Sequence, residues 1–576
     1  MKNVKNLFGM AVMATALVGC SSNDNLNPNA NDNAGKTGEA YASFKINLPT
    51  TSGTRAPEGS EDIKDGTPSF NGGTAAEYAV NDATLLVFQK DGDDYKYIET
   101  VDLGSMVPWT KQDPTTNSGI TTTATVTAKL TNAAVGESGN YYALILLNNN
   151  VDATKKKVTL PTATTDTYAN WSKDVSKANA DNYLKHDNGF FMANAPKYVA
   201  GGEPETLVKI DKIYASKQQA EISAATTVYV ERGLAKVTMK NFTTTGYDIA
   251  DGTYKEANVK INSWQLDVTN KSTFPVHQTA GLYTSWTGIW ANTRFYDGST
   301  TSAFKRVYWG TDPNYNTGLS TVSDCKAAFN MITKDKVKGE AGETHPQYCL
   351  ENTFDLNNMK QGQTTRVVFK AVFTPKGFTG TEKTFYKIGN NTALWKEADL
   401  ETQIKAKAQE VLKESDASKV TVTLNAPTNN LTEAGVHLVA AANVTHVGAT
   451  TALTEDQVKA INTKLGLEEK TAKEERVGIS TYYNGEAYYI ARIKHFNELT
   501  PWNAGEAYGT DNGKYLGRYG VLRNNWYELS VNKVTGLGYP DVPQVKPTDP
   551  DDENEQYINV EVKILDWAKR SQSIDL

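Results

Sequence analysis

Few residues of this chain are arranged as an enzyme would arrange them. The six histidines are scattered, and none stands in the H-x-x-x-H or H-E-x-x-H spacing of a helical zinc site. The sequence also lacks a G-x-S-x-G nucleophile elbow and a phosphate-binding loop. The acidic cluster at residues 549–555 lacks the spacing and glycine of an EF-hand, so a solvated linker is favoured over a calcium site. We therefore predict no catalytic residue, no metal, no cofactor and no enzymatic activity.

One cysteine stands where a lipid could be attached. Lys2 and Lys5 precede an apolar run from Leu7 to Val18, which is too short to span a bilayer as a mature helix. The following tetrapeptide, Leu-Val-Gly-Cys, ends at Cys20 and resembles the bacterial lipobox, in which the cysteine is acylated after the signal peptide (residues 1–19) is removed. The alternative is an ordinary secretory signal with a chance cysteine. Either interpretation predicts a body outside the cytoplasm.

The other two cysteines are Cys325 and Cys349. In an exported protein they could form one disulfide, and their spacing gives no C-x-x-C metal signature. Two unpaired thiols in a large fold that needs no crosslink are an equally good interpretation.

Arg55 is placed for proteolysis. It lies in a run of small and turn-forming residues, 50–59, which predicts an exposed loop. No other arginine occurs before Arg232, and a lone arginine in an accessible loop suits a trypsin-like protease. A solvated arginine of no importance is the alternative.

Two strands with period-two alternation lie near opposite ends of the chain. Residues 39–50 alternate Ala42, Phe44, Ile46 and Leu48 with polar residues. Residues 557–567 alternate in the same way after a Pro-, Asp- and Glu-rich spacer, which predicts an extended, solvated tether. A tethered strand can fold back on its own sheet or complete the sheet of another molecule. Its apolar face consists of Ile558, Val560, Val562 and Ile564.

The composition favours a mainly β protein. Tyr (29) outnumbers Phe (17) and Trp (10), and short runs of Thr, Val and Tyr are separated by Gly, Asn and Asp. The net charge of −7 is spread along the chain without a basic stripe, so we predict no nucleic-acid partner. The length of 576 residues predicts more than one domain.

The pattern divides the chain at about residue 240. Strands are predicted at 83–89, 120–130, 141–147, 227–240 (with a bulge at Gly233), 259–268, 365–374 and 521–531. Helices are predicted at 391–414 and after the capping box that starts at Thr454, and a hairpin is predicted to turn at Asn484-Gly485. The predicted regions are a leader (20–55), two domains (56–240 and 241–540), a linker (541–556) and a terminal strand (557–576).

These features, in this order, resemble the type V pilins of the Bacteroidales, in the FimA/Mfa fimbrillin superfamily. The similarity is greatest to the shaft subunit of the minor (Mfa-type) fimbrium. Besides the lipobox and Arg55, it rests on the strand ending in Asn148, on Val228-Tyr229-Val230-Glu231-Arg232 followed by Ala235, on Val521-Leu522-Arg523-Asn524-Asn525-Trp526-Tyr527, and on the C-terminal Val560-Glu561-Val562, Leu565-Asp566-Trp567 and Ile574-Asp575-Leu576. Residues 243–480 add little to the resemblance.

The resemblance implies two transthyretin-like β-sandwich domains with a few short helices and a C-terminal donor strand. It implies a precursor lipidated at Cys20, attached to the outer membrane and cut between Arg55 and Ala56 by a trypsin-like protease. The leader would then leave with its strand, and the donor strand of the next subunit would fill the groove. The implied partners are copies of the chain, anchor and tip subunits of the pilus, and host or bacterial surface ligands, in a cell-surface fimbrium.

Two other classes remain open from the residues. A tip adhesin or a surface glycan-binding lipoprotein would use exposed aromatic residues such as Trp286, Trp290 and Trp502, although core packing is their commoner use. A membrane anchor of a pilus would keep its lipid, which the Arg55 loop disfavours.

Overall fold

The computed structural model describes most of the chain from residue 39 to residue 566. The described ranges are 39–49, 74–104, 110–111, 120–136, 139–162, 166–285, 304–378, 383–470, 476–495, 515–551 and 558–566, with backbone alone at 49, 75, 110–111, 120–122, 285 and 558–566. All of them belong to one compact unit, Glu39–Leu576. The prediction of a mainly β protein with few helices is confirmed. Within the described ranges, none of the helices has the length and apolarity needed to cross a bilayer.

The first half of the chain builds a large mixed sheet. Its order is β3-β2-β6-β7-β9-β1-β5-β4, with β8 paired to β6 off this path. The bounds are β1 Ala40–Pro49, β2 Ala83–Asp91, β3 Asp94–Asp102, β4 Thr110–Lys111, β5 Ile120–Leu130, β6 Tyr141–Leu147, β7 Met192–Asn194, β8 Val208–Lys209 and β9 Thr226–Arg232. The strands predicted at 83–89, 120–130 and 141–147 are therefore confirmed, whereas β3 was not predicted.

The centre of this sheet is apolar on both faces. β6 is almost continuously apolar, and its residues Ala143–Leu147 are fully buried. It ends at Asn148, whose backbone has a positive φ of 55°. The Asn148 side chain donates to the carbonyls of Ala79 and Phe190 (both 2.8 Å) and accepts from the N–H of Asn81 (2.7 Å). This asparagine thus fixes three neighbouring segments at the end of the strand.

Gly233 separates two sheets rather than forming a bulge in one strand. β9 ends at Arg232, and β10 (Leu234–Met239) enters a second sheet with the order β15-β10-β26-β27. A side chain at position 233 would have its Cβ 2.3 Å from the hydroxyl of the buried Tyr183, so only glycine fits there. The other members are β15 Gln347–Leu350, β26 Asn525–Val534 and β27 Ile558–Asp566.

A third sheet, β11-β12-β16-β25, packs with the second around one apolar core. Its strands are β11 Tyr247–Asp248, β12 Asn258–Asp267, β16 Arg366–Thr374 and β25 Glu486–Arg492. β12 and β16 confirm the strands predicted at 259–268 and 365–374. Trp264 and Phe369 are fully buried in this core.

Residues 383–482 form a lobe with a core of its own, inserted between the paired strands β16 and β25. It contains both predicted helices, α7 (Glu397–Leu412) and α8 (Glu455–Lys464), and Thr454 makes the predicted capping box with Gln457. Its sheets are β18-β17-β24-β22, β19-β23 and β20-β21. Their bounds are β17 Phe385–Ile388, β18 Leu394–Trp395, β19 Val420–Val422, β20 Asn425–Ala426, β21 Asn429–Asn430, β22 Gly435–His437, β23 Val444–His446 and β24 Ile479–Tyr482.

The predicted hairpin at Asn484-Gly485 is wrong. Both residues have the expected positive φ, 53° and 76°. However, β24 pairs with β17 and β22, whereas β25 pairs with β16. The turn therefore carries the chain from one sheet to another. The Phe385 ring stacks on Tyr482 at 4.7 Å and holds β24 beside β17.

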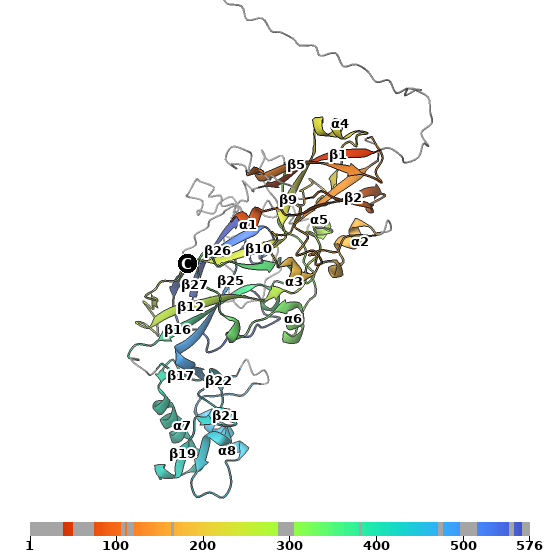
Figure 1. Cartoon of the computed structure of the whole chain (residues 1–576). Coiled ribbons are helices and arrows are strands. Elements are labelled where there is room, and N and C mark those ends of the chain that lie inside the picture. Colours follow the sequence, from red (N-terminus) through yellow and green to blue (C-terminus); the bar gives the residue numbers. More distant parts are fainter. Residues whose placement is uncertain are drawn as a thin grey trace, which may run out of the picture. The chain divides into compact units, whose positions relative to one another are not determined.

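The remaining elements are short. They are α1 Ala75–Tyr78, α2 Tyr168–Ser172, α3 Ala180–Tyr183, α4 Lys217–Ile222, α5 Leu282–Ser285, α6 Val322–Ala328 and the pair β13 Thr269–Asn270 with β14 Phe329–Asn330. Figure 1 shows α4 lying over β1 and β5, and β27 beside β26.

Candidate functional site

The predicted leader strand is an interior strand of the large sheet. β1 pairs antiparallel with β5 along its whole length, from Ala40 opposite Leu130 to Pro49 opposite Ile120. On its other side, Phe44–Asn47 pair in parallel with Thr226–Tyr229 of β9. Loss of β1 would therefore open two strand edges that face each other across one strand's width.

One face of β1 is a row of buried apolar side chains. Ala40, Ala42, Phe44, Ile46 and Leu48 are each at most 1% exposed and belong to the core of the large sheet. This is the alternation expected of a strand with one face in a core. Burial of a large apolar side chain stabilises by about 1.5–3 kcal/mol, so Phe44, Ile46 and Leu48 dominate the docking of the strand. Removal of β1 would leave three deep apolar subsites and two shallow ones.

The predicted donor strand folds back on its own chain. β27 pairs antiparallel with β26, with Val560 opposite Val531, Val562 opposite Leu529 and Ile564 opposite Tyr527. It is the last strand of its sheet, so it has one strand neighbour among the described residues. Of the two options left open for this strand, the structure shows the first, and among the described strands none pairs with the second edge of β27.

The linker predicted to be solvated instead packs on the body as far as Asp551. Val545 is buried, and the carbonyl of Pro543 accepts a hydrogen bond from Arg366 (2.5 Å). Asp551 is 1% exposed, and its carboxylate accepts from the Thr364 hydroxyl (3.1 Å). The composition predicted solvation because proline and acidic residues are usually exposed, but here the linker carbonyls and carboxylate satisfy buried donors. If the C-terminal strand detaches, only the residues after Asp551 are therefore free to move with it.

Cys20, Arg55 and Ala56 lie outside the described residues. The structure describes both sides of the predicted cut, with β1 ending at Pro49 and α1 beginning at Ala75. Glu77 of α1 is buried, and its carboxylate contacts Lys236 Nζ (2.7 Å) and accepts from the Tyr348 hydroxyl (2.7 Å). Although burial opposes ionisation, the hydrogen bond and charge of Lys236 lower the pKa of Glu77. These contacts hold the chain after the cut independently of β1.

A buried ionic junction joins the sequence motifs at residues 228–235 and 521–527. Its members are Glu231, His277, Arg306, Glu351 and Arg523, whose side chains are all at most 3% exposed. Glu231 contacts Arg306 Nε at 2.5 Å and His277 Nδ1 at 2.6 Å, and Arg523 Nε donates to Glu351 at 3.0 Å. The Arg306 guanidinium also donates to the carbonyl of Arg523 (3.1 Å).

The neighbouring motif residues are in contact as well. The Asn524 side-chain oxygen accepts from the backbone N–H of Arg232 (3.1 Å) and from its guanidinium (3.3 Å). Although burial opposes ionisation, the charges of Arg306 and His277 hold the pKa of the Glu231 carboxyl at about 2. The motifs at 228–235 and 521–527 therefore have a structural role at the junction. Sequence reasoning found the motifs but missed His277, Arg306 and Glu351, which carry no local signal.

The disulfide considered for Cys325 and Cys349 is not formed, and both thiols are free and buried. Cys349 lies on β15 opposite Ala235, within the core of the second and third sheets. Cys325 lies on α6 near Gly362 and Pro547. Burial raises the pKa of Cys325 to about 11 and that of Cys349 to about 12, so both thiols stay protonated.

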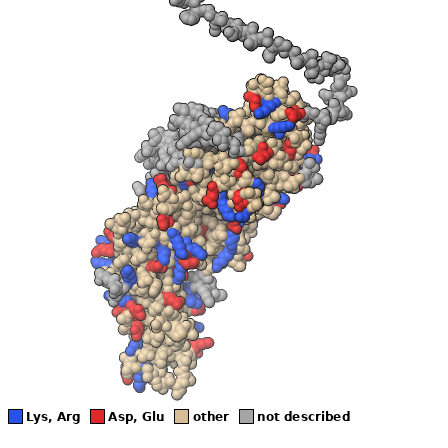
Figure 2. Space-filling view, viewed as in Figure 1, with Lys and Arg blue, Asp and Glu red and all other residues tan. Residues whose placement is uncertain are grey.

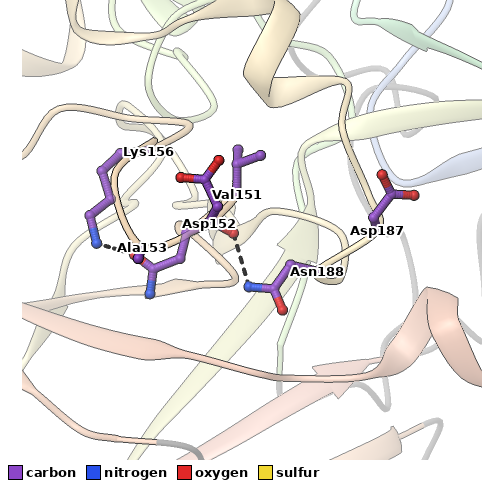
Figure 3. A pocket seen from close by; sticks show the side chains of 7 residues that line it. Val151, Asp152, Ala153, Lys156, Asp187 and Asn188 are labelled. Atoms are coloured by element: carbon purple, nitrogen blue, oxygen red, sulfur yellow. Dashed lines mark hydrogen bonds between the residues drawn. The ribbon is translucent and has the colours of Figure 1, made fainter.

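An open polar hollow of about 530 Å³ lies among the described residues. Figure 3 shows the side chains that line it, with Asn188 donating to the carbonyl of Asn150 (3.2 Å). The Asp152 carboxylate accepts from the N–H groups of Thr154 and Lys155 (both 2.8 Å), which lowers its pKa and closes its own turn. Among the described residues, no group of three His, Cys, Asp or Glu could hold a metal ion. The hollow therefore has no feature that selects a ligand.

Charged residues are interspersed on the visible face of the described residues. Figure 2 shows acidic and basic side chains mixed across this face, without a stripe of one sign. This arrangement agrees with the spread net charge of −7 in the sequence.

Comparison with known proteins gives one family match. Residues 480–573 match the family described as "Major fimbrial subunit protein type IV, Fimbrillin, C-terminal". These residues include the motif at 521–527 and the strands β25, β26 and β27. A search of curated proteins found no match.

Similar solved structures were also found. One, from Parabacteroides distasonis and described as a putative cell adhesion protein, is 11% identical, with 92% of this chain and 99% of that chain covered and a TM-score of 0.35. Another is the tip fimbrial protein Mfa3 from Porphyromonas gingivalis with a C-terminal truncation, which is 9% identical, with 92% and 100% covered and a TM-score of 0.27. Both TM-scores are below 0.5, so these two structures do not establish the fold or the role of this chain.

The matched family consists of fimbrial subunits, which are structural proteins, and the mainly β fold of this chain agrees with the match. The C-terminal region, residues 480–573, is similar to the fimbrillin family, which confirms the resemblance found in the sequence for this part of the chain. The Mfa type within that superfamily stays a prediction.

Proposed function

We propose that this chain is a shaft subunit of a type V fimbrium and that it polymerises by strand exchange. The precursor is exported, acylated at Cys20 and held at the outer membrane. A trypsin-like protease cuts between Arg55 and Ala56, and residues 20–55 leave with β1. The C-terminal strand of a neighbouring subunit then fills the vacated groove. Anchor and tip subunits complete the fimbrium, which serves adhesion or biofilm formation by binding host or bacterial surfaces.

The observation that carries the proposal is the position of β1. It is an interior strand with five buried inward side chains, yet the segment that joins it to the body contains Arg55. A strand removed from that position leaves unpaired N–H and C=O groups on β5 and β9, together with an apolar slot. Exposed edges of this kind recruit strands.

The pairing of β27 with β26 supports the direction of exchange. Among the described strands of its own subunit β27 has one neighbour, whereas a strand in the β1 groove has two, β5 and β9. Exchange therefore adds a second ladder of backbone hydrogen bonds for the same strand. The inward residues Ile558, Val560, Val562 and Ile564 also supply branched apolar side chains for the groove, worth about 6–12 kcal/mol gross if fully buried. Ordering the strand offsets part of this gain.

Substitution of the predicted cleavage site tests the proposal. In the wild type, mass spectrometry of surface fimbriae should find Ala56 at the mature N-terminus. Arg55→Ala should leave an acylated, membrane-bound precursor with no polymer, because β1 stays in its groove. Lys45→Ala is a matched control, since Lys45 is an exposed basic residue of the same leader. Assembly of Arg55→Ala at the wild-type level would contradict protease gating at this site.

A further inference from the structure

A short segment closes over the outward face of β1. We call residues 213–222 the clasp. Tyr214 and Tyr41 exchange two backbone hydrogen bonds of 2.8 Å each, so the clasp pairs with β1 where β9 does not reach. Ile213 makes the same exchange with Gly136 (2.9 and 3.0 Å), which ties the clasp to the loop after β5.

The helix of the clasp, α4, packs directly on β1. Figure 1 shows α4 over β1 and β5. Ala220 is its buried residue and is 0% exposed. The Ser43 hydroxyl donates to the carbonyl of Ala220 (2.8 Å) and lies 2.6 Å from the Thr127 hydroxyl of β5. Ser43 is thereby 5% exposed although it points away from the core of the sheet.

The contact at Ser43 requires a small side chain. Ala220 and Thr127 enclose the serine, whereas the next outward residue, Lys45, lies beyond the clasp and is exposed. A long side chain at position 43 would have to displace α4, because close-packed interiors have no room for extra atoms. The outward residues of the C-terminal strand are Asn559, Glu561 and Lys563, and all three are longer than serine.

The inward face next to the clasp is also built for small residues. Ala40 and Ala42 fill the groove at this end, whereas Phe44, Ile46 and Leu48 fill the other end. The C-terminal strand has Ile or Val at all of its inward positions from 558 to 564. It fits the deep end of the groove better than the shallow end.

We propose that the clasp is a specificity element that recognises the small side chain at position 43 of the strand in the groove. It accepts β1 and does not close over the C-terminal strand. In the precursor the clasp therefore retains the leader strand. Its opening during exchange is the part of this inference that rests on the proposed function.

Hydrogen–deuterium exchange of the uncut monomeric precursor tests the clasp without assembly. Ser43→Lys should raise the exchange rate of residues 213–222 by at least ~tenfold, because α4 can no longer close. Lys45→Ser, on the same face of β1, should leave that rate within about twofold. Ser43→Ala keeps the size and loses the hydroxyl, and should leave the clasp mostly protected.

The outcomes separate the alternatives. If Ser43→Lys is as protected as the wild type, or if Ser43→Ala opens the clasp as far as Ser43→Lys, recognition of side-chain size is wrong. If Ser43→Lys does not fold, Ala220→Leu enlarges the buried residue of α4 whose carbonyl binds Ser43, so it should displace α4 and give the same rise. In assembled fimbriae, residues 213–222 should exchange faster than in the precursor. Fimbriae that need residues 556–576 yet keep the clasp protected would overturn the inference while leaving strand exchange intact.

Discussion

Deletion of residues 556–576 should abolish polymer ladders and leave a folded, soluble monomer. The deletion removes the only strand that we propose to be donated, whereas β1, the groove and the junction stay in place. It also frees one edge of β26, so the truncated subunit should unfold at a lower temperature but still cooperatively. Denaturing gels of unheated fimbrial preparations measure the ladders, and circular dichroism measures the fold.

Two double substitutions separate the two faces of the C-terminal strand. The first changes the inward face, and the second changes the outward face and is the control. Val560→Asp with Val562→Asp places two charges on the inward face and should abolish ladders like the deletion, because a groove cannot bury unpaired carboxylates. Glu561→Gln with Lys563→Gln changes the outward face of the same strand and should assemble normally. Normal ladders from the truncated chain would mean that residues 556–576 are not the donor.

Glu231→Gln should have the largest effect on folding stability. The substitution leaves Arg306 and His277 buried beside a neutral amide, in place of a charge at 2.5 and 2.6 Å. Breaking a buried ion pair from one side typically costs about 3–5 kcal/mol. Glu468→Gln, in an exposed pair with Lys470, is the control and should change stability by less than about 0.5 kcal/mol. Denaturant unfolding of the monomer measures both.

The pH dependence of stability gives an independent check of the same residue. The folded pKa of Glu231, about 2, lies below the usual value of 4.5, so ionised Glu231 stabilises the folded state fully above pH 4.5. This contribution is lost as the pH falls from 4.5 toward 2. Glu231→Gln should therefore lose stability less steeply than the wild type in this range. Equal stability of variant and wild type at pH 7 would contradict a structural role of the junction.

Local patterns in the sequence predicted the elements that local physics determines. The alternation of residues 39–50 predicted β1, and Thr454 with Gln457 predicted the start of α8. Asn484-Gly485 predicted the positive φ angles correctly but not the strand partners, because β24 and β25 pair with strands far away in the sequence. Turn chemistry is local, whereas partner choice depends on tertiary packing.

The long-range contacts of the site had no signal in the sequence. His277, Arg306 and Glu351 lie on separate segments, and only the fold brings them to Glu231 and Arg523. The prediction that the linker is solvated is wrong for a similar reason. Its composition is that of a solvated spacer, yet Asp551 finds a buried partner in Thr364, 187 residues away.

The most direct test of strand exchange is the binding of a synthetic peptide, residues 556–576, to subunits truncated after residue 555. Binding is measured before and after cleavage at Arg55 and removal of the leader. The account predicts that the peptide binds the leader-free subunit at least ~100-fold more tightly than the uncut precursor, whose groove holds β1. Equal binding to both forms would show that the peptide only returns to the free edge of β26, and it would contradict competition between the two strands for one groove.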